Sequence, residues 1–489
     1  MAGGVSAAVD GDLVTEIPGL ASPFPQRIWS GYIEVPTVNG SANVHYVLVE
    51  NGANKSDAPT LVWQQGGPGG SSLIGLFTEV GPLTLNDASL TAKGVPEVFA
   101  NPNSWHLAPA NMLFVEHPAP TGFSYCVGDC YWNDTSQSEV NYQFYVNFFE
   151  KYPELADNDF YFSGESYAGV LVPTVTLQIL KHRTEENRHK APWSLKGYAL
   201  GNDCPGNQIF TCTPYSGWRG TKVALDFRFG HGMISEELYA EITDACKDWW
   251  QGEKPFPSTD GPSKEGPPEG SKCRELLEDP VRPCMSVAGD TYDMGGGYFL
   301  YDTCSADLLA LGNRSALLTA PQPTARQVAA SKYALDSGEY ACGQEAASAT
   351  WLNRPDVQKA LHVKLVGKQS FGFSTGLNYT FTTGSLLDEY KADLIPNFRI
   401  MQYSGDADPC VPYVGTQRWI DSLDLNVVKP WRPWTADGPH DSGMVAGYVT
   451  EYENNFTFVT IRDAGHMAPR YKPTQTFYMI KQFLHGHSL

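Results

Sequence analysis

The sequence is poor in basic residues. Its 489 residues include 34 Lys and Arg against 54 Asp and Glu, so the formal net charge is −20 at pH 7. Nucleic-acid binding depends largely on Lys and Arg side chains that release counterions from the phosphate backbone, and an anionic membrane surface attracts the same positive charge. We therefore expect neither a nucleic-acid partner nor a membrane partner.

Long apolar runs are also missing. No stretch approaches the roughly 18 consecutive apolar residues of a membrane-spanning helix. Asp10, Asp12 and Glu16 interrupt the N-terminal stretch where a signal peptide would need its apolar segment. We therefore expect a soluble chain, and the lack of a visible leader fits both a cytosolic protein and a mature secreted one.

Internal repeats are absent as well, which excludes solenoids and propellers. The 42% hydrophobic and 12% aromatic content, with only 18% charged residues, is typical of a folded chain. The length permits two or three domains of about 100–200 residues each, although α/β enzymes of this size often keep one core with an inserted smaller domain.

The ten cysteines lack the CxxC spacing of a zinc site, and no histidine cluster lies beside them. We therefore expect disulfides, with no metal ion and no other cofactor. Candidate pairs that are close in the sequence are Cys126/Cys130, Cys204/Cys212 and Cys273/Cys284. Six N-x-S/T sequons are candidate glycosylation sites: Asn39, Asn54, Asn133, Asn313, Asn378 and Asn455. Both features favour the secretory pathway, with a vacuolar, lysosomal or extracellular destination.

The hydrophobic pattern indicates an interrupted α/β core. Strand-like runs interleave with amphipathic stretches before about Leu200 and again after Trp351, whereas the pattern degrades between them. Gln251–Lys272 is almost wholly Gly, Pro, Ser and charged residues, which is typical of a loop or a cleavable linker. We expect an N-terminal extension (1–27), a core in two parts (28–203 and 346–489), and an inserted Cys-rich cap (204–345) with a flexible linker at 251–272.

The strongest chemical signal is the segment DFYFSGESYAG, Asp159 to Gly169. A buried strand, a sharp turn with Ser166 at its apex and the start of a helix follow one another, which is the order that a nucleophile elbow requires. Gly164 and Ala168 flank the serine with little bulk, although Ala replaces the second Gly of the G-x-S-x-G pattern. The alternative is an ordinary turn, because so short a pattern arises by chance.

Two later strand-turn segments supply partners for Ser166. RIMQYSGDADPCVP holds Asp406 and Asp408, and FVTIRDAGHMAP holds His466. The order serine, acid, histidine is that of an α/β-hydrolase triad, in which the imidazole takes the serine proton and the carboxylate orients the imidazole. The alternatives are a turn-forming aspartate and a histidine on a surface loop.

A glycine-rich stretch follows an earlier strand, in WQQGGPGGSSLIGLFTEVGP from Trp63 to Pro82. Its backbone N–H groups can stabilise the oxyanion of an acyl-transfer intermediate. A phosphate-binding loop is the rival interpretation. It fails because no Lys-Ser/Thr follows and no G-x-G-x-x-G spacing occurs.

Six ordered motifs together resemble the serine carboxypeptidase family over nearly the whole chain, from about Tyr32 to Phe483. They are GGPGGSS (66–72), PTGFSY (120–125), GESYAG (164–169), WLNRPDVQKAL (351–361), YSGDAD (403–408) and AGHMAP (464–469). The resemblance implies an α/β-hydrolase fold, with a central mixed, mostly parallel sheet flanked by helices and an inserted cap. It also implies removal of C-terminal amino acids from peptide substrates at acidic pH.

The resemblance assigns roles to individual residues. It implies a catalytic triad of Ser166, Asp408 and His466, and an oxyanion hole from the N–H groups of Gly67 and Tyr167. It implies that the substrate's terminal carboxylate is bound by Gln65, Gly66, Glu79 and Glu165, and that Trp63 and Met467 line the pocket. Two adjacent carboxyls cannot both ionise cheaply, so Glu79 and Glu165 would share a proton and accept a carboxylate only while protonated. Two separate solvated acids are the alternative.

Departures from the family pattern leave alternatives open. Gln65 stands where the family usually has Asn, which lengthens the reach of the amide by a methylene. Gly70 stands where the family usually has Cys, so Cys342 either finds another partner in the insertion or stays a thiol. KPWRPW (429–434) and AGYVTEY (446–452) resemble the branch that includes acyltransferases acting on small-molecule esters. Acyl transfer and a partner-stabilising role with secondary catalysis are thus the alternatives to peptide hydrolysis, and a homodimer is a candidate assembly.

Overall fold

A computed structural model shows how the chain folds. It describes residues 11–51, 58–91, 94–206, 220–251, 266–278, 297–302, 304, 324–337, 339–436 and 443–489. Asn54, Cys212, Cys284, Asn313 and most of the predicted linker lie outside the described residues. In the ranges that are described, no helix is both long enough and apolar enough to span a bilayer.

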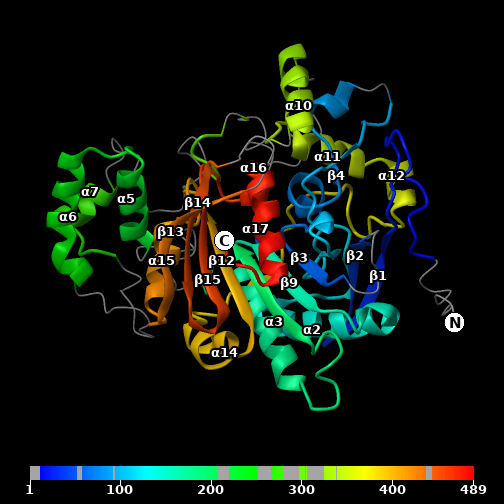
Figure 1. The fold of residues 1–489 in the computed structure, drawn as a ribbon, viewed down its shortest axis with the longest axis horizontal. Helices are drawn as coiled ribbons and strands as arrows, with labels where there is room; N and C mark the ends of the chain where they lie inside the picture. The colour runs from blue at the N-terminus through cyan, green and yellow to red at the C-terminus, as the bar shows by residue number, and fades with distance from the viewer. Residues whose placement is uncertain are drawn as a thin grey trace.

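An eleven-stranded sheet runs through the molecule (Figure 1). Its order is β1-β2-β6-β3-β9-β10-β12-β15-β14-β13, and β7 pairs with β2 beside this path. The strands are β1 (Ile28–Thr37), β2 (Gly40–Val49), β3 (Thr60–Gln64), β6 (Asn111–Val115), β7 (Tyr125–Gly128), β9 (Phe160–Glu165), β10 (Leu195–Gly201), β12 (Arg399–Gly405), β13 (Val427–Thr435), β14 (Val445–Tyr452) and β15 (Phe456–Ile461). Neighbours from β6 to β15 are parallel, and the outer pairs are antiparallel. The predicted α/β fold with a mixed, mostly parallel central sheet is confirmed.

Helices cover both faces of this sheet (Figure 1). The main ones are α2 (Asp134–Lys151), α3 (Ala168–His182), α11 (Gln344–Leu352), α15 (Tyr413–Asp421) and α17 (Pro473–His485). Side chains of α11 and α17 pack in one hydrophobic cluster, and side chains of α2, α3 and α15 pack in another. Sequential strands joined by covering helices produce the parallel centre of the sheet, because a parallel pair needs a long crossover.

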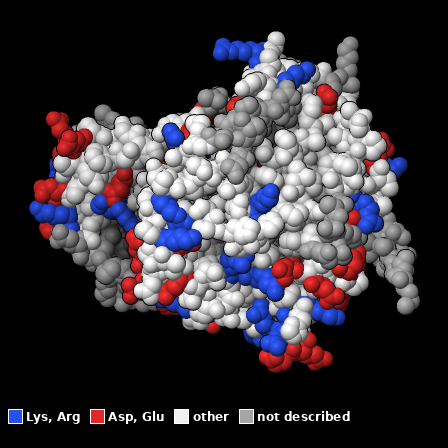
Figure 2. Space-filling view, in the orientation of Figure 1, with Lys and Arg blue, Asp and Glu red and all other residues white. Residues whose placement is uncertain are grey.

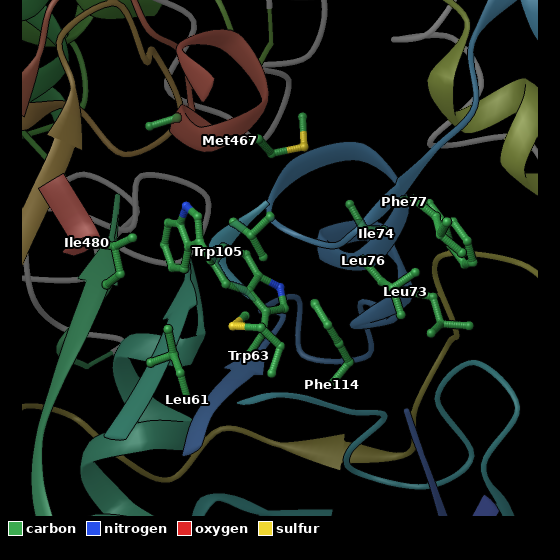
Figure 3. Close-up of a cluster of buried hydrophobic side chains, with 14 of the residues drawn as sticks. Leu61, Trp63, Leu73, Ile74, Leu76, Phe77, Trp105, Phe114, Met467 and Ile480 are labelled. Atoms are coloured by element: carbon green, nitrogen blue, oxygen red, sulfur yellow. The ribbon is translucent and has the colours of Figure 1, made fainter. Parts of the chain in front are cut away.

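Strand β3 illustrates why the central strands of the sheet have continuous apolar runs in their sequences. Leu61 and Trp63 belong to the first cluster and Val62 to the second, and none of the three has exposed surface. Such burial on both faces is typical of parallel strands. Figure 3 shows part of the first cluster, where Trp63 and Trp105 lie beside each other with ring centroids 5.6 Å apart in an edge-on arrangement. This packing fixes the end of β3 from which the glycine-rich loop departs.

Helices of the predicted cap form a separate lobe beyond α15 (Figure 1). They are α5 (Thr221–Gly230), α6 (Glu236–Gln251) and α7 (Lys272–Glu278), and they share a small hydrophobic cluster of their own. Figure 2 shows acidic and basic side chains gathered on this lobe and along the lower edge of the molecule. An ion pair between Asp226 of α5 and Arg418 of α15 joins the lobe to the core. The exact domain bounds stay a prediction.

Three disulfides lie among the described residues. Cys126–Cys130 is confirmed, and Cys342 pairs with Cys304 inside the insertion, which settles the question that Gly70 raised. The candidate pair Cys273/Cys284 does not form, because Cys273 bonds Cys246. The two helices α6 and α7 pack side by side, so the spatial neighbour of Cys273 is 27 residues away rather than the nearest cysteine in the sequence. Cys204 is also disulfide-bonded, and Cys410 is a titratable thiol.

Candidate active site

Ser166 lies in the turn between β9 and α3, as the sequence predicted. Its φ is 61°, in the left-handed region that non-glycine residues rarely adopt. Backbone hydrogen bonds hold this conformation. The N–H of Ser166 donates to the carbonyl of Gly201 at 3.0 Å, and its carbonyl accepts from the N–H of Cys204 at 3.1 Å. The turn is thus tied to the segment that follows β10, and its shape is that of a nucleophile elbow.

Close backbone approach explains the small residues around Ser166. A Cβ atom on Gly164 would lie 2.3 Å from the carbonyl oxygen of Gln64 in the neighbouring strand β3. A Cβ atom on Gly66 would lie 2.7 Å from the Cβ of Ser166 and 2.5 Å from the amide nitrogen of Tyr167. Neither clash could be relieved by a side-chain rotation. The glycine-rich loop therefore passes directly against the serine and the first amide of the helix.

Asp408 and His466 meet on the turns after β12 and β15. These strands are parallel neighbours, so their carboxyl ends lie at the same edge of the sheet. Nδ1 of His466 is 2.8 Å from Oδ2 of Asp408, and both side chains are buried. The backbone N–H groups of Cys410 and Val411 donate to the same carboxylate at 2.7 and 3.1 Å. These donors hold the carboxyl group of Asp408 in place, and its contact with Nδ1 orients the imidazole ring.

Two backbone contacts fix His466 from the side of the insertion. The N–H of His466 donates to the carbonyl of Tyr298 at 2.6 Å, and the two rings lie 5.0 Å apart. A Cβ atom on Gly465 would lie 2.3 Å from that same carbonyl. Ser166 Oγ makes no hydrogen bond to the residues that the structure describes.

Sequence reasoning missed Asn202, which links the acid to the elbow. Its Nδ2 donates to Oδ2 of Asp408 at 2.8 Å, and its Oδ1 accepts from the N–H of Gly405 at 3.0 Å. Asn202 follows β10 directly and has a φ of 41°, a conformation that Asn tolerates better than most residues. The one signal in the sequence was an Asn placed immediately after a strand.

Glu79 and Glu165 form the buried acid pair that the resemblance implied. Glu79 ends the short helix η1 (Gly75–Glu79), and Glu165 ends β9, one residue before Ser166. Burial raises the pKa of Glu79 from 4.5 to about 7, and burial together with the neighbouring charge of Glu79 raises the pKa of Glu165 well above its usual range. Both are almost completely buried, which excludes two separate solvated acids. One proton on the pair relieves the repulsion between them.

Gln65 joins this acid pair to the hydrophobic core. Its Nε2 donates to Oε1 of Glu165 at 2.5 Å, and its Oε1 accepts from Nε1 of Trp63 at 2.9 Å. This hydrogen bond lowers the pKa of Glu165 against the larger effect of burial. Trp63 and Met467, both predicted to line the pocket, are buried in the first hydrophobic cluster. Trp63 thus touches the site through Gln65.

Arg470 supplies positive charge near the acid pair, and the sequence did not indicate it. Its guanidinium forms a buried ion pair with Glu345, with Nη2 at 2.8 Å from Oε2. The same guanidinium lies over the ring of Tyr340, 5.1 Å from its centroid. Arg470 lowers the pKa of Glu79, opposing burial. A cavity of about 40 Å³ is lined by both Glu79 and Arg470.

Other parts of the structure do not join this site. A larger cavity of about 570 Å³ lies between the end of β1, the Cys126–Cys130 turn and α2, and none of the predicted catalytic or substrate-binding residues lines it. Among the described residues, no group of three or more His, Cys, Asp or Glu side chains comes together as metal ligands.

Comparisons with known proteins find similar sequences and a similar fold over nearly the whole chain. The family described as Serine carboxypeptidase matches residues 18–486. Serine carboxypeptidase 1 of Hordeum vulgare is 30% identical over 99% of this chain and 94% of its own length. Lysosomal protective protein of Mus musculus is 30% identical over 98% of this chain and 94% of its own. The crystal structure of Kex1(delta)p, a prohormone-processing carboxypeptidase from Saccharomyces cerevisiae, covers 98% of this chain and 96% of its own with a TM-score of 0.67 and 20% identity.

The acid pair predicts a pH-dependent stability. Because the pKa of Glu79 is raised from 4.5 to about 7, the folded state holds a proton that the unfolded chain has released between these values. The stabilisation is fully present below about pH 4.5 and is lost as pH rises through about 7. We expect the free energy of unfolding of the wild type to fall by on the order of 1–3 kcal/mol over this pH range. The double variant Glu79→Gln/Glu165→Gln should not show this fall.

Urea unfolding at about pH 5 and about pH 8, compared between wild type and the double variant, measures this loss. Burial also raises the pKa of Asp203 to about 8. Asp203 is present in both proteins, so its effect cancels in the difference. Equal pH dependence in the two proteins would contradict a shared proton on the pair.

Asn202 is expected to control the reactivity of Ser166 through Asp408. The variant Asn202→Gly removes the amide while glycine keeps the positive φ. We expect a fluorophosphonate to label Ser166 about 10–100-fold more slowly, because a less firmly held Asp408 orients His466 poorly. Asn202→Asp, which sets a second carboxylate against Asp408, should be slower still. Unchanged labelling rates in both variants, with unchanged thermal unfolding, would rule out this role.

Proposed function

Since the chain belongs to the serine carboxypeptidase family, we propose that it releases single amino acids from the C-termini of peptides. The observation that carries this proposal is the buried pair of Glu79 and Glu165 directly beside Ser166. The substrates of a general esterase or an endopeptidase present no free carboxylate next to the bond that is cleaved, so two protonatable carboxyls beside the nucleophile would have no group to bind. A free C-terminal carboxylate, by contrast, is recognised well by a group that can donate a proton in a hydrogen bond.

The proposed reaction is a two-step acyl transfer. Ser166 Oγ attacks the carbonyl of the last peptide bond while Nε2 of His466 takes the serine proton and passes it to the leaving amine. Asp408 holds the imidazole through its Nδ1. The backbone N–H groups of Gly67 and Tyr167 stabilise the oxyanion, which the close approach of the two turns supports. Water, activated by His466, then hydrolyses the acyl-enzyme.

Capture of the terminal carboxylate ties this reaction to pH. Gln65 donates one amide hydrogen to Glu165 and has a second that a substrate carboxylate can accept. Gly66 itself lies against the turn that carries Ser166, so its N–H is a candidate second donor to the carboxylate. The acid pair attracts a carboxylate only while it holds a proton, and ionised it repels one. Binding is therefore strongest on the acid side of about pH 7, which is the pKa of Glu79.

An oxidising, acidic compartment suits these properties. Three disulfides among the described residues form and persist in the secretory pathway and outside the cell. Asn39, Asn378 and Asn455 of the predicted sequons are exposed, whereas Asn133 uses its side chain to cap α2. We propose a secretory-pathway protein with a vacuolar, lysosomal or extracellular destination and peptides as its substrates.

The decisive measurement is kcat/KM for a blocked dipeptide and for its C-terminal amide between about pH 4 and about pH 8. We expect cleavage of the dipeptide to fall as pH rises through about 7, following the pKa of Glu79. The amide should be a poor substrate at every pH, without that fall. Ser166→Ala should lower turnover of the dipeptide by at least about 10⁴-fold.

Two outcomes would defeat the proposal. Equal cleavage of dipeptide and amide would show that the terminal carboxylate is not recognised. No cleavage of either, despite fluorophosphonate labelling of Ser166, would point to an acyltransferase or esterase acting on small-molecule esters.

Gln65 is expected to act on substrate capture rather than on chemistry. Gln65→Met keeps the length of the side chain and removes the amide, and a hydrogen bond to a charged group contributes about 1.5–3 kcal/mol. We therefore expect KM for the blocked dipeptide to rise about 10–100-fold with little change in kcat. Gln65→Asn retains an amide and serves as the matched variant, with a smaller rise. An equal rise in KM for the amidated substrate would show that Gln65 supports the site without touching the carboxylate.

A further inference from the structure

A buried carboxylate, Glu116, lies where the glycine-rich loop meets the PTGFSY motif. Glu116 follows β6 directly and has no exposed surface. Its Oε1 accepts from the hydroxyl of Ser71, and its Oε2 accepts from the N–H of Phe123 at 2.8 Å. A Cβ atom on Gly122, which has a φ of 53°, would lie 1.5 Å from Oε1. The PTGFSY motif is therefore a turn that surrounds this carboxylate. Neither Glu116 nor the motif takes part in the proposed reaction steps.

His45 is the charged partner of Glu116. Nδ1 of His45 is 2.7 Å from Oε2 of Glu116, and Nε2 is 2.9 Å from Oγ of Ser30. Both ring nitrogens thus have a partner, and both partners and the ring itself are completely buried. The protonation state of this histidine follows from the donors and acceptors around it.

Ser30 decides that state. Its Oγ lies 2.5 Å from the carbonyl oxygen of Leu361, which can only accept, so the single hydroxyl proton of Ser30 points there. Oγ must then accept from Nε2 of His45. One further proton lies between Nδ1 and Oε2 of Glu116, because one of these two atoms must donate to the other. Held on Nδ1, this proton makes the contact an ion pair between an imidazolium and a carboxylate.

This ion pair is attached to the loop that approaches Ser166. Ser71, which donates to Glu116, follows Gly70 in the loop, and its N–H donates to the carbonyl of Phe373 at 2.8 Å. Ser72 Oγ donates to the carbonyl of Val115 at 2.6 Å and accepts from the N–H of Gln65 at 3.1 Å. Among these anchors, the bond from Ser71 to Glu116 has a charged acceptor, and such bonds are roughly twice as strong as neutral ones.

We propose that Glu116, paired with a protonated His45, is a positioning residue for the loop that carries Gly66 and Gly67. It acts through Ser71 on the backbone amides at these two glycines and does not touch the reacting atoms. The effect expected on peptide turnover rests on the proposed function, in which the Gly67 amide stabilises the oxyanion. The effect on the reactivity of Ser166 does not require that peptides are the substrate.

The test compares Glu116→Gln, Ser71→Ala and the double variant. We expect each single variant to lower kcat for the blocked dipeptide about 10–100-fold, because a small displacement of an oxyanion donor is costly. The double variant should be no slower than the slower single variant, since both changes break the same link. Labelling of Ser166 by a fluorophosphonate should slow by a similar factor, which separates failure of this proposal from failure of the proposed peptidase function.

Glu50→Gln is the matched control. Glu50 is a buried carboxylate after β2 that pairs at 2.8 Å with Arg27, whose side chain is half exposed, so this ion pair tests the loss of a buried carboxylate charge away from the loop. We expect this variant to keep wild-type kcat and labelling rate. Unchanged kcat and labelling in Glu116→Gln, or losses that add in the double variant, would overturn the proposal.

A measurement on the wild type covers the case in which Glu116→Gln does not fold. Nitrogen NMR of protein labelled at its histidines distinguishes an imidazolium from both neutral tautomers. At about pH 7.5, where an exposed histidine is mostly neutral, we expect one buried imidazolium signal that disappears in His45→Gln. A neutral His45 under these conditions would overturn the proposal independently of any kinetic result.

Discussion

The close approach of two backbone turns around Ser166 is the constraint on which the rest of the site depends. Gly66 lies against Ser166 and Tyr167, and Gly164 lies against the carbonyl of Gln64 in the adjacent strand. These contacts involve backbone inside a parallel sheet, where Gln64 pairs with Gly164, so no rotamer change can relieve them. The register of β3 and β9 therefore fixes Ser166 and the loop amides relative to each other, independently of the side chains that surround them.

The remaining side chains follow from the same sheet. Glu165, Asn202, Asp408 and His466 each come within a few residues of the end of β9, β10, β12 or β15, which are neighbours in the sheet. Because carboxyl ends of parallel strands share one edge, residues that are far apart in the sequence converge there. Asn202 completes this arrangement by bonding Asp408 at the end of the adjacent strand. The arrangement of these side chains is thus a property of strand order more than of any single loop.

This dependence on strand ends explains what could be predicted from the sequence. Ser166, the turn with Asp406 and Asp408, and His466 were recognisable because each follows an apolar run, and the fold class followed from the same alternation. The choice of Asp408 over Asp406 came from the family resemblance. Contacts that join distant, unpatterned segments were not recognisable. Tyr298 against His466, Glu345 against Arg470, and Cys246 against Cys273 have no signal in spacing, since each depends on how separately folded pieces pack. His45 and Glu116 lie in strand-like surroundings that gave no sign of a buried ion pair.

Two departures from the family pattern, Gln65 and Gly70, are best understood as one change. A Cβ atom on Gly70 would lie 3.0 Å from Cγ of Gln65 and 2.9 Å from the carbonyl oxygen of Gly66, so a cysteine at position 70 would press on the longer side chain. Without it, Gln65 keeps both amide ends engaged, with Trp63 and with Glu165. The space beside Gly70 accommodates the extra methylene of Gln65, so the amide group is not pushed toward the substrate. The two departures therefore keep an amide donor beside the acid pair. This favours the interpretation that the site still recognises a peptide carboxylate.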